Sequence, residues 1–219
     1  MGNITPQICR MKIEKQVKVL TGGNAESDKV LIVLHGYGQL AQYFIRKFES
    51  VGQDFHIIAP EGPHRFYLEG FSGRVGASWM TKEQREWDIE DNLAYLEQVV
   101  EKYGLNKEVY ILGFSQGGAT AARYVAQSKY PIKQFVLWAS VLPEEFTSGE
   151  STHLPLMHKS FVLGTNDSFF TVEQQKEIIH SYTNFGFTCH SFEGNHDIHT
   201  NTLVDVLKMP TFGTLSAKV

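Results

Sequence analysis

The sequence has few cysteines and no long hydrophobic segment. Of its 219 residues, only Cys9 and Cys189 are cysteine. Two cysteines so far apart in sequence are more often reduced than paired, as is usual in the cytoplasm. The longest purely aliphatic run, residues 30–34, is far too short to span a bilayer. We therefore expect a cytoplasmic protein with no integral membrane association.

Charge is also sparse. The net charge of −4 at pH 7 argues against nucleic acid as a partner, and no basic run suggests a membrane-binding patch. The amino terminus lacks a basic region followed by an apolar one, so we expect no signal peptide. A length of 219 residues suits one α/β domain over residues 1–219. We expect this domain to be a monomer or a homodimer.

Short apolar segments alternate with helical patterns along most of the chain. Strands are predicted at residues 29–34, 55–59, 109–112, 135–139, 161–163 and 187–192, and helices at 41–48, 81–104, 116–127, 171–186 and 198–207. This order predicts an α/β fold with a mostly parallel central sheet flanked by helices on both faces.

Three local patterns refine this prediction. Apolar residues of one parity over residues 11–19 predict a half-buried strand at the start of the sheet. Thr81 with Gln84, and Thr171 with Gln174, fit the spacing of a capping box, which predicts helices that begin there.

The most informative motif is Gly113-Phe-Ser115-Gln-Gly117, which has the spacing G-x-S-x-G between a predicted strand and a predicted helix. A turn this tight strains the backbone at Ser115, and the flanking glycines remove side chains that would clash. The hydroxyl is then held at the carboxyl end of the sheet. The N–H of Gln116 points to the same place and can donate to a developing oxyanion. The motif predicts a nucleophilic serine.

A serine nucleophile needs a base and an acid, and two later loops supply them. Asp167 follows the strand at 161–163, and His196 follows the last strand. The carboxyl ends of parallel strands lie at one edge of a sheet, where ligands bind. An imidazole takes the serine proton, and a carboxylate orients the imidazole. The order Ser115, Asp167, His196 is that of α/β-hydrolases.

Other residues compete for these roles. His199 is the main rival for the base, and Asp197 and Asp205 are rivals for the acid, although both belong to the last predicted helix. His196 and His199 also form His-x-x-His, which is a possible metal pair. No third ligand has a recognisable spacing, so we expect neither a metal nor a cofactor.

A further motif, His35-Gly-Tyr-Gly38, follows the strand expected beside the nucleophile strand, where glycine lets the backbone aim an N–H at the oxyanion. With this motif, the chain resembles the phospholipase/carboxylesterase family of α/β-hydrolases, which includes the acyl-protein thioesterases. The resemblance covers nearly the whole chain. Its most specific part is Gly-Phe-Ser-Gln-Gly-Gly at 113–118, and the other parts are His-Gly-Tyr-Gly at 35–38, Ala-Ser-Trp at 77–79, Gly-Thr-Asn-Asp at 164–167 and Gly-Asn-His at 194–196.

The resemblance implies the α/β-hydrolase fold and a triad of Ser115, Asp167 and His196. It also implies an oxyanion hole made by the backbone N–H groups of Tyr37 and Gln116. The chain departs from the family pattern at two places. Family members commonly have Gly-Leu-Gly-Asp where this chain has Gly-Tyr-Gly-Gln at 36–39, and Phe-Asp where it has Met-Thr at 80–81. Both segments border the acyl pocket in the family, so protein thioesterase activity is not implied.

The long segment at residues 61–79 is rich in glycine and aromatic residues. A loop of this length is usually functional. We expect it to form a wall of the acyl pocket, with Phe66, Phe71 and Trp79 as candidate pocket residues beside Tyr37. The alternative is that residues 61–79 are a packed surface loop and that residues 141–158 form the pocket instead.

These observations predict a serine hydrolase that cleaves carboxylic esters of small or medium acyl chains through an acyl-enzyme. The substrate is expected to be a small-molecule ester or thioester. One alternative is a thioesterase or lysophospholipase that acts on longer acyl chains. An alternative of another class is a non-catalytic relative that binds a ligand or a partner.

Overall fold

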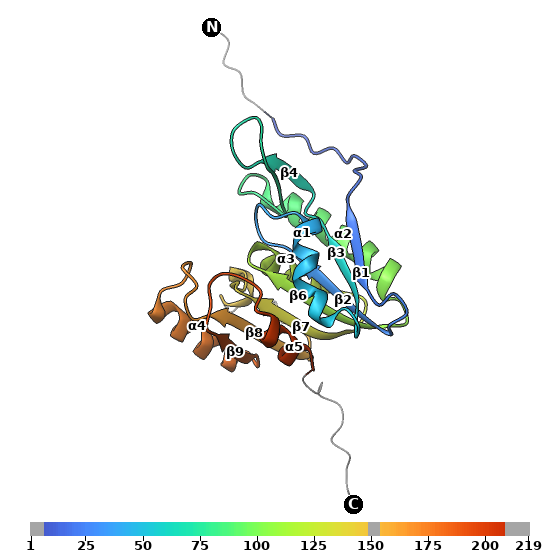
Figure 1. The fold of residues 1–219 in the computed structure, drawn as a ribbon. Helices are drawn as coiled ribbons and strands as arrows, with labels where there is room; N and C mark the ends of the chain where they lie inside the picture. The colour runs from blue at the N-terminus through green and yellow to red at the C-terminus, as the bar shows by residue number, and fades with distance from the viewer. Residues whose placement is uncertain (1–6, 149–153, 209–219) are drawn as a thin grey trace, which may run out of the picture.

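The computed structural model describes residues 7–148 and 154–208. Its central layer is a seven-stranded sheet in the order β1-β3-β2-β6-β7-β8-β9 (Figure 1). The strands are β1 (Val19–Gly23), β2 (Lys29–Leu34), β3 (His56–Pro60), β6 (Glu108–Phe114), β7 (Ile132–Trp138), β8 (His158–Gly164) and β9 (Thr188–Phe192). Only β1 runs antiparallel to its neighbour. The predicted mostly parallel sheet is confirmed. The expectation of no signal peptide concerns the amino terminus, of which residues 1–6 lie outside the described part.

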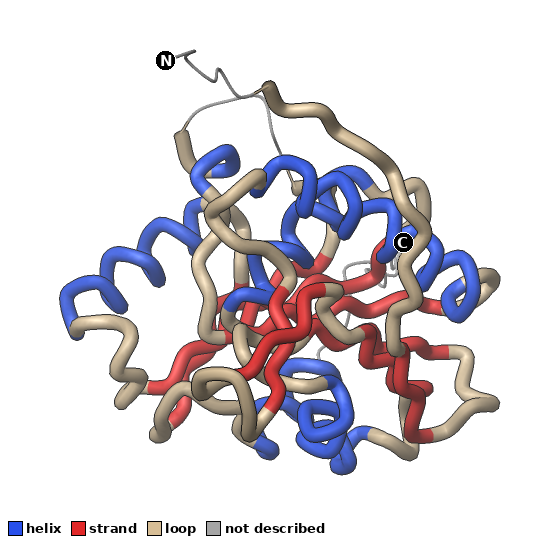
Figure 2. Tube along the Cα trace, turned by 90° about the horizontal axis from the view of Figure 1, so that it is seen from above, coloured by secondary structure: helices blue, strands red, loops and turns tan. Residues whose placement is uncertain are grey.

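Helices cover both faces of the sheet (Figure 2). They are α1 (Ala41–Phe44), the 3₁₀ helix η1 (Ile45–Val51), α2 (Arg85–Gly104), α3 (Gln116–Gln127), the 3₁₀ helix η2 (Glu144–Phe146), α4 (Val172–Asn184) and α5 (Thr200–Lys208). Within the described residues, no helix is both long and apolar enough to cross a membrane.

The direction of the strand side chains decides which helix covers which face. Phe114 of β6 packs on Phe44 of α1, with ring centroids 5.8 Å apart. Gln134 on the same face of β7 donates to a carbonyl of α5, so α1, η1 and α5 share this face. On the other face, Phe161 of β8 packs on Tyr182 of α4, where α2 and α3 also lie. The strands between these layers are almost completely buried, as expected for a parallel sheet.

The predicted strand at residues 11–19 was wrong for most of its length. Residues 7–18 have no regular structure, and Met11 and Ile13 are 82% and 85% exposed. The strand β1 begins only at Val19, which is paired with Pro60 at the end of β3. Residues before Val19 therefore have no neighbouring strand to pair with. An alternating apolar pattern forms a strand only where such a neighbour is present.

The segment at residues 61–79 is not a simple loop. It contains a two-stranded antiparallel sheet, formed by β4 (His64–Tyr67) and β5 (Val75–Ser78). This hairpin stands apart from the central sheet in Figure 1. A bridge between Gln39 and Ala77 fastens β5 to the loop that follows β2. Periodicity missed these strands because each is only four residues long.

The longest helix begins later than predicted. It starts at Arg85 rather than Thr81, and Gln84 has a left-handed backbone with φ 51°. The N–H of Thr81 donates to the side chain of Asp88, so the predicted capping box is absent. Residues 78–80 are instead held by hydrogen bonds with Gln116 and Asn92. The second capping box, formed by Thr171 and Gln174, is confirmed.

Candidate active site

Ser115 occupies a strained turn between β6 and α3. Its φ of 52° lies in a region that non-glycine residues seldom adopt. A side chain at Gly117 would collide with the backbone of β2, lying only 2.6 Å from the carbonyl oxygen of His35, and one at Gly113 would collide with α3. The Ser115 N–H donates to the carbonyl of Trp138 on β7 at 3.0 Å. The turn thus presents the hydroxyl at the carboxyl end of the sheet.

Asp167 and His196 meet at the same edge of the sheet. The Nδ1 atom of His196 lies 2.7 Å from Oδ2 of Asp167. The Asp167 side chain is completely buried and that of His196 is 18% exposed. A carboxylate can only accept, so Nδ1 carries the proton in this contact. The Nε2 atom of a neutral imidazole is then left as an acceptor, which is the form a general base requires.

Backbone contacts hold these two loops together. The N–H groups of Thr165 and Asn166 donate to the carbonyls of Phe192 and Gly194, each at 2.9 Å. A side chain at Gly164 would collide with the backbone of residues 194–195. The second carboxylate oxygen of Asp167 accepts the N–H of Phe169 at 3.0 Å. The Asp167 carboxylate is therefore also held by contacts other than the one with His196.

Aromatic side chains and β7 fix the histidine loop beside the serine. The His196 ring packs against the rings of Phe114 and Phe169, at centroid distances of 4.9 Å and 4.4 Å. The indole of Trp138 donates to the carbonyl of Asp197 at 2.9 Å. Since Ser115 donates to the carbonyl of Trp138, the serine turn and the histidine loop are both anchored to this tryptophan.

The rival residues make other contacts. His199 hydrogen-bonds through Nδ1 to Thr202 in the first turn of α5, and its ring stacks on Phe192. Asp197 forms an ion pair with Lys47 at 2.6 Å. Asp205 is exposed on α5. Residues 7–148 and 154–208 contain no cluster of three or more potential metal ligands of the His, Cys, Asp or Glu type.

Two backbone N–H groups near Ser115, those of Tyr37 and Gln116, are the candidate oxyanion donors. Gln116 is the first residue of α3, and the N–H groups at a helix start have no acceptor inside the helix. A side chain at Gly36 would lie 3.1 Å from Cβ of Ser115, so the loop after β2 passes directly beside the serine. In this loop, Gly36 donates to the side chain of Gln39 and Gly38 donates to Ala77. The Tyr37 N–H makes no hydrogen bond within the described part of the chain.

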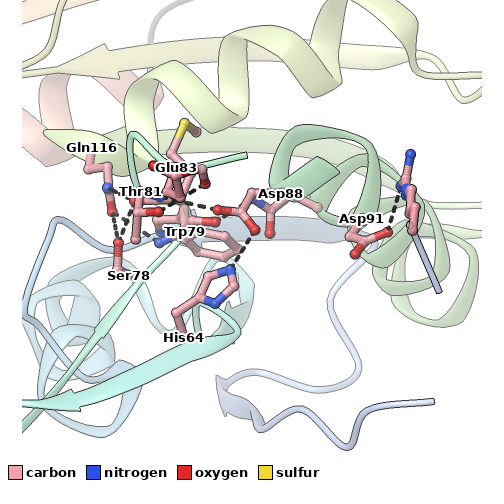
Figure 3. Close-up of polar contacts among 11 residues, drawn as sticks. His64, Ser78, Trp79, Thr81, Glu83, Asp88, Asp91 and Gln116 are labelled. Carbon is pink, nitrogen blue, oxygen red and sulfur yellow. Dashed lines mark hydrogen bonds and ion pairs between the residues drawn. The ribbon is translucent and has the colours of Figure 1, made fainter. Parts of the chain in front are cut away.

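The Gln116 side chain joins the serine turn to residues 78–80 (Figure 3). Its Oε1 accepts from the hydroxyl of Ser78 at 3.1 Å and from the N–H of Trp79 at 3.0 Å. Its Nε2 donates to the carbonyl of Met80 at 2.9 Å. The indole of Trp79 in turn donates to the carbonyl of His35 at 2.8 Å. One short segment thus contacts both loops that carry the candidate oxyanion donors.

The His35 side chain connects the loop after β2 with Gly62. It is completely buried, its Nε2 accepts the N–H of Gly62 at 2.9 Å, and Nδ1 lies 2.7 Å from the carbonyl of Gly36. This pattern fixes the neutral ring with the proton on Nδ1, and burial lowers the pKa of His35 below its usual 6.5. Sequence reasoning named His35 only as part of a motif. It missed Gln39 and the side-chain role of Gln116, for which no local pattern gives a signal.

The three candidate pocket residues lie in different surroundings. Trp79 is completely buried beneath the loop, and Phe71 is fully exposed. The Phe66 ring packs on Tyr37 at a centroid distance of 5.0 Å. Phe66 thus contacts Tyr37 of the candidate oxyanion hole, and Trp79 contacts Gln116 of it through its backbone N–H. Residues 149–153 lie outside the described part, so the alternative pocket at 141–158 is only partly described.

The family model described as "Serine hydrolase (FSH1)" matches residues 25–203. The chain belongs to this family of serine hydrolases. Its fold is similar to that of the esterase PE8, with 19% identity, coverage of 88% of this chain and 96% of that chain, and a TM-score of 0.66. A carboxylesterase from Bacillus cereus has 19% identity, coverage of 86% and 91%, and a TM-score of 0.63. The predicted α/β-hydrolase fold and the resemblance to serine esterases are confirmed.

A curated relative is also similar over part of its length. The chain is 26% identical over 142 residues to a protein of Oryza sativa subsp. japonica named "Probable 1-acylglycerol-3-phosphate O-acyltransferase". The match covers 63% of this chain and 30% of the rice protein, so the chain spans about a third of that relative's length.

Proposed function

We propose that the protein hydrolyses carboxylic esters of small or medium acyl chains through an acyl-enzyme on Ser115. The observation that carries this proposal is the hydrogen bond between His196 and the buried Asp167, beside a serine in a strained strand-to-helix turn. Membership in a serine hydrolase family supports the same chemistry. The proposed substrates are small molecules.

In the first half of the reaction, the Ser115 oxygen attacks the carbonyl carbon of the ester while His196 Nε2 takes the hydroxyl proton. The negative charge that develops on the carbonyl oxygen is stabilised by the N–H groups of Tyr37 and Gln116. Asp167 stabilises the imidazolium that forms. The tetrahedral intermediate expels the alcohol, which takes the proton from His196, and the acyl group remains on Ser115.

In the second half, a water molecule gives its proton to His196 and attacks the acyl carbon. The same two N–H groups stabilise the second oxyanion. Collapse of this intermediate releases the carboxylic acid, and the Ser115 oxygen takes its proton back from His196. The protein ends the cycle unchanged, and no redox step is involved.

A second candidate function is hydrolysis of longer acyl esters or thioesters. Tyr37, Phe71 and Phe169 are 62%, 100% and 71% exposed, and each belongs to a loop or hairpin that reaches the catalytic edge of the sheet. Exposed aromatic side chains of this kind suit contact with an apolar chain. The same triad would serve, and only the preferred length of the acyl group would differ.

The test combines active-site labelling with a substrate series. Nitrophenyl esters of increasing chain length, with matched thioesters, would be assayed on purified protein, and a fluorophosphonate probe would be applied in parallel. We expect Ser115→Ala to abolish labelling and to lower kcat by on the order of 10⁴ to 10⁶, because the acyl-enzyme cannot form. The exposed Ser50 offers a matched control, since Ser50→Ala should change neither readout. Labelling that survives in Ser115→Ala would point to another nucleophile, and absence of labelling in the wild-type protein would point to a non-catalytic protein; either result would contradict the proposal.

A further inference from the structure

A cavity of about 400 Å³ is lined by residues of α1 and η1 on one side and of the β4–β5 hairpin on the other. Leu40 and Phe44 line it from the α1 side, and Leu68 and Val75 line it from the hairpin side. The segment at residues 61–79 therefore does line a cavity, but through Leu68, Arg74 and Val75 rather than through the three aromatic residues expected from the sequence.

Three contacts connect this cavity with the candidate catalytic residues. Gly38, which lines the cavity, follows Tyr37 directly and donates to the carbonyl of Ala77 in the hairpin at 2.8 Å. The Phe44 ring packs on Phe114, which precedes Ser115 and contacts the ring of His196. The candidate oxyanion loop thus borders the cavity. The rings of Phe44 and Phe114 connect the cavity wall with His196 and with the residue before Ser115.

Two cations also line the cavity, and none of the lining residues is acidic. They are Lys47 from η1 and Arg74 from the hairpin. The Lys47 ammonium contacts Asp197 at 2.6 Å, which leaves it further N–H donors, and its side chain is 34% exposed. Arg74 is 81% exposed, and Glu69 lies 3.6 Å away, beyond a good hydrogen-bond distance. An anion in the cavity would thus meet two positive groups and an apolar wall, and the carboxylates paired with these groups, Asp197 and Glu69, are not among the lining residues.

We propose that this cavity binds the anionic group of an ester substrate, so that the enzyme prefers esters carrying a carboxylate or phosphate on the part that enters it. This inference rests on the proposed esterase function and specifies its substrate class. The apolar residues would contact the carbon chain, and Arg74 and Lys47 would contact the charge. The anion can belong to the acyl part or to the alcohol part of the ester, and the two are separable by experiment.

The first experiment compares matched substrates on the wild-type protein. For the acyl side, nitrophenyl half-esters of succinate, glutarate and adipate are compared with nitrophenyl esters of uncharged acyl groups of equal length. For the alcohol side, the butanoyl ester of glycolate is compared with propyl butanoate. We expect the anionic ester to have the higher kcat/KM in one of the two arms, with an optimum length in the half-ester series. The preference should weaken at high ionic strength, because both cations are partly exposed to solvent.

The second experiment removes one cation. Arg74→Gln should lower the ratio of kcat/KM for the anionic ester to that for the neutral ester by about 5- to 10-fold, the effect of one charge contact near solvent. Arg74→Glu should lower it further. Lys102→Gln makes the same change of net charge on α2, away from the cavity, and should leave the ratio unchanged.

A binding measurement makes the inference independent of turnover. In Ser115→Ala protein, calorimetry should detect the half-ester and show that Arg74→Gln weakens its binding by a similar factor. The inference is overturned if neutral esters are preferred in both arms, if Arg74→Gln leaves the ratio and the binding unchanged, or if Lys102→Gln has the same effect. Absence of any ester hydrolysis would refute the proposed function instead, and the binding measurement would still decide the inference.

Discussion

Replacing Gln116 by alanine should reduce both stability and turnover, since this side chain connects the serine turn with residues 78–80. The N–H of Trp79 would lose its acceptor within a residue that is completely buried. An unsatisfied buried donor costs about 1–3 kcal/mol, and the lost bond from Nε2 to Met80 adds about 0.5–1.5 kcal/mol. The expected loss of unfolding free energy is therefore about 1.5–4.5 kcal/mol. For a domain of this size, each kcal/mol lowers Tm by roughly 2–4 °C.

The effect on turnover follows from the position of the Gln116 N–H. Complete loss of an oxyanion donor costs about 10²- to 10³-fold in kcat, so a donor that is only displaced should cost about 10- to 100-fold, with little change in KM. Urea unfolding and ester kinetics would be measured on Gln116→Ala and on Gln127→Ala, an exposed glutamine at the other end of α3. If kcat stays within about twofold while stability falls as expected, the side chain is structural only, and the reasoning is refuted.

Gln116→Glu separates the two roles. A carboxylate keeps an acceptor for the Trp79 N–H but cannot donate to Met80, so stability should lie between those of the wild type and the alanine variant. Its negative charge opposes the charge that develops on the oxyanion. We therefore expect kcat to stay low although stability is partly regained. Recovery of both quantities together would contradict a positioning role for this residue.

Three further predictions concern the other polar residues of the site. His196→Ala should nearly abolish ester turnover while His199→Ala, which removes a contact at the start of α5, should be mild; the reverse ranking would make His199 the base. Asp167→Asn should lower kcat by up to about 10⁴-fold because it favours the wrong tautomer of the base, whereas Asp197→Asn should mainly affect the exposed contact with Lys47. Burial lowers the pKa of His35, so the unfolded chain binds a proton below about pH 6.5 that the folded chain does not. The free energy of unfolding should thus decrease as the pH is lowered below about 6.5, by up to about 1.4 kcal/mol per pH unit for this group. Urea titrations at several pH values should show a smaller dependence on pH in His35→Gln.

The parts of the fold predicted well are those in which local sequence and tertiary structure agree. The predicted bounds of α3 match the structure, and the Thr171 capping box forms as its spacing predicts. The strand-to-helix turn at Ser115 could be located because it requires glycine at fixed positions. The order of the loops then placed Asp167 and His196 at one edge of a parallel sheet, and their side chains meet there.

The errors occurred where a segment depends on partners distant in sequence. Residues 11–18 alternate like a strand, but the partner strand β3 ends at Pro60, which pairs with Val19, so no strand lies beside them. The capping box expected at Thr81 is absent because residues 78–80 are held by Gln116 and Asn92. The cavity combines side chains from η1 and from the tip of the hairpin, and no periodicity links these two segments.

The two departures from the pattern of the resembled family acquire a physical meaning in the structure. Gln39 stands where an aspartate is common, and its side-chain oxygen accepts the N–H of Gly36 at 2.9 Å while the residue also lines the cavity. Met80 stands where a phenylalanine is common, and its sulfur lies 3.7 Å from the guanidinium of Arg123. Because Gln39 is neutral, no residue that lines the cavity carries a carboxylate, which is consistent with the proposed anionic ligand. The side chain of Gln39 therefore contacts the loop of the proposed oxyanion hole, that of Met80 contacts Arg123, and neither touches the contact between Asp167 and His196.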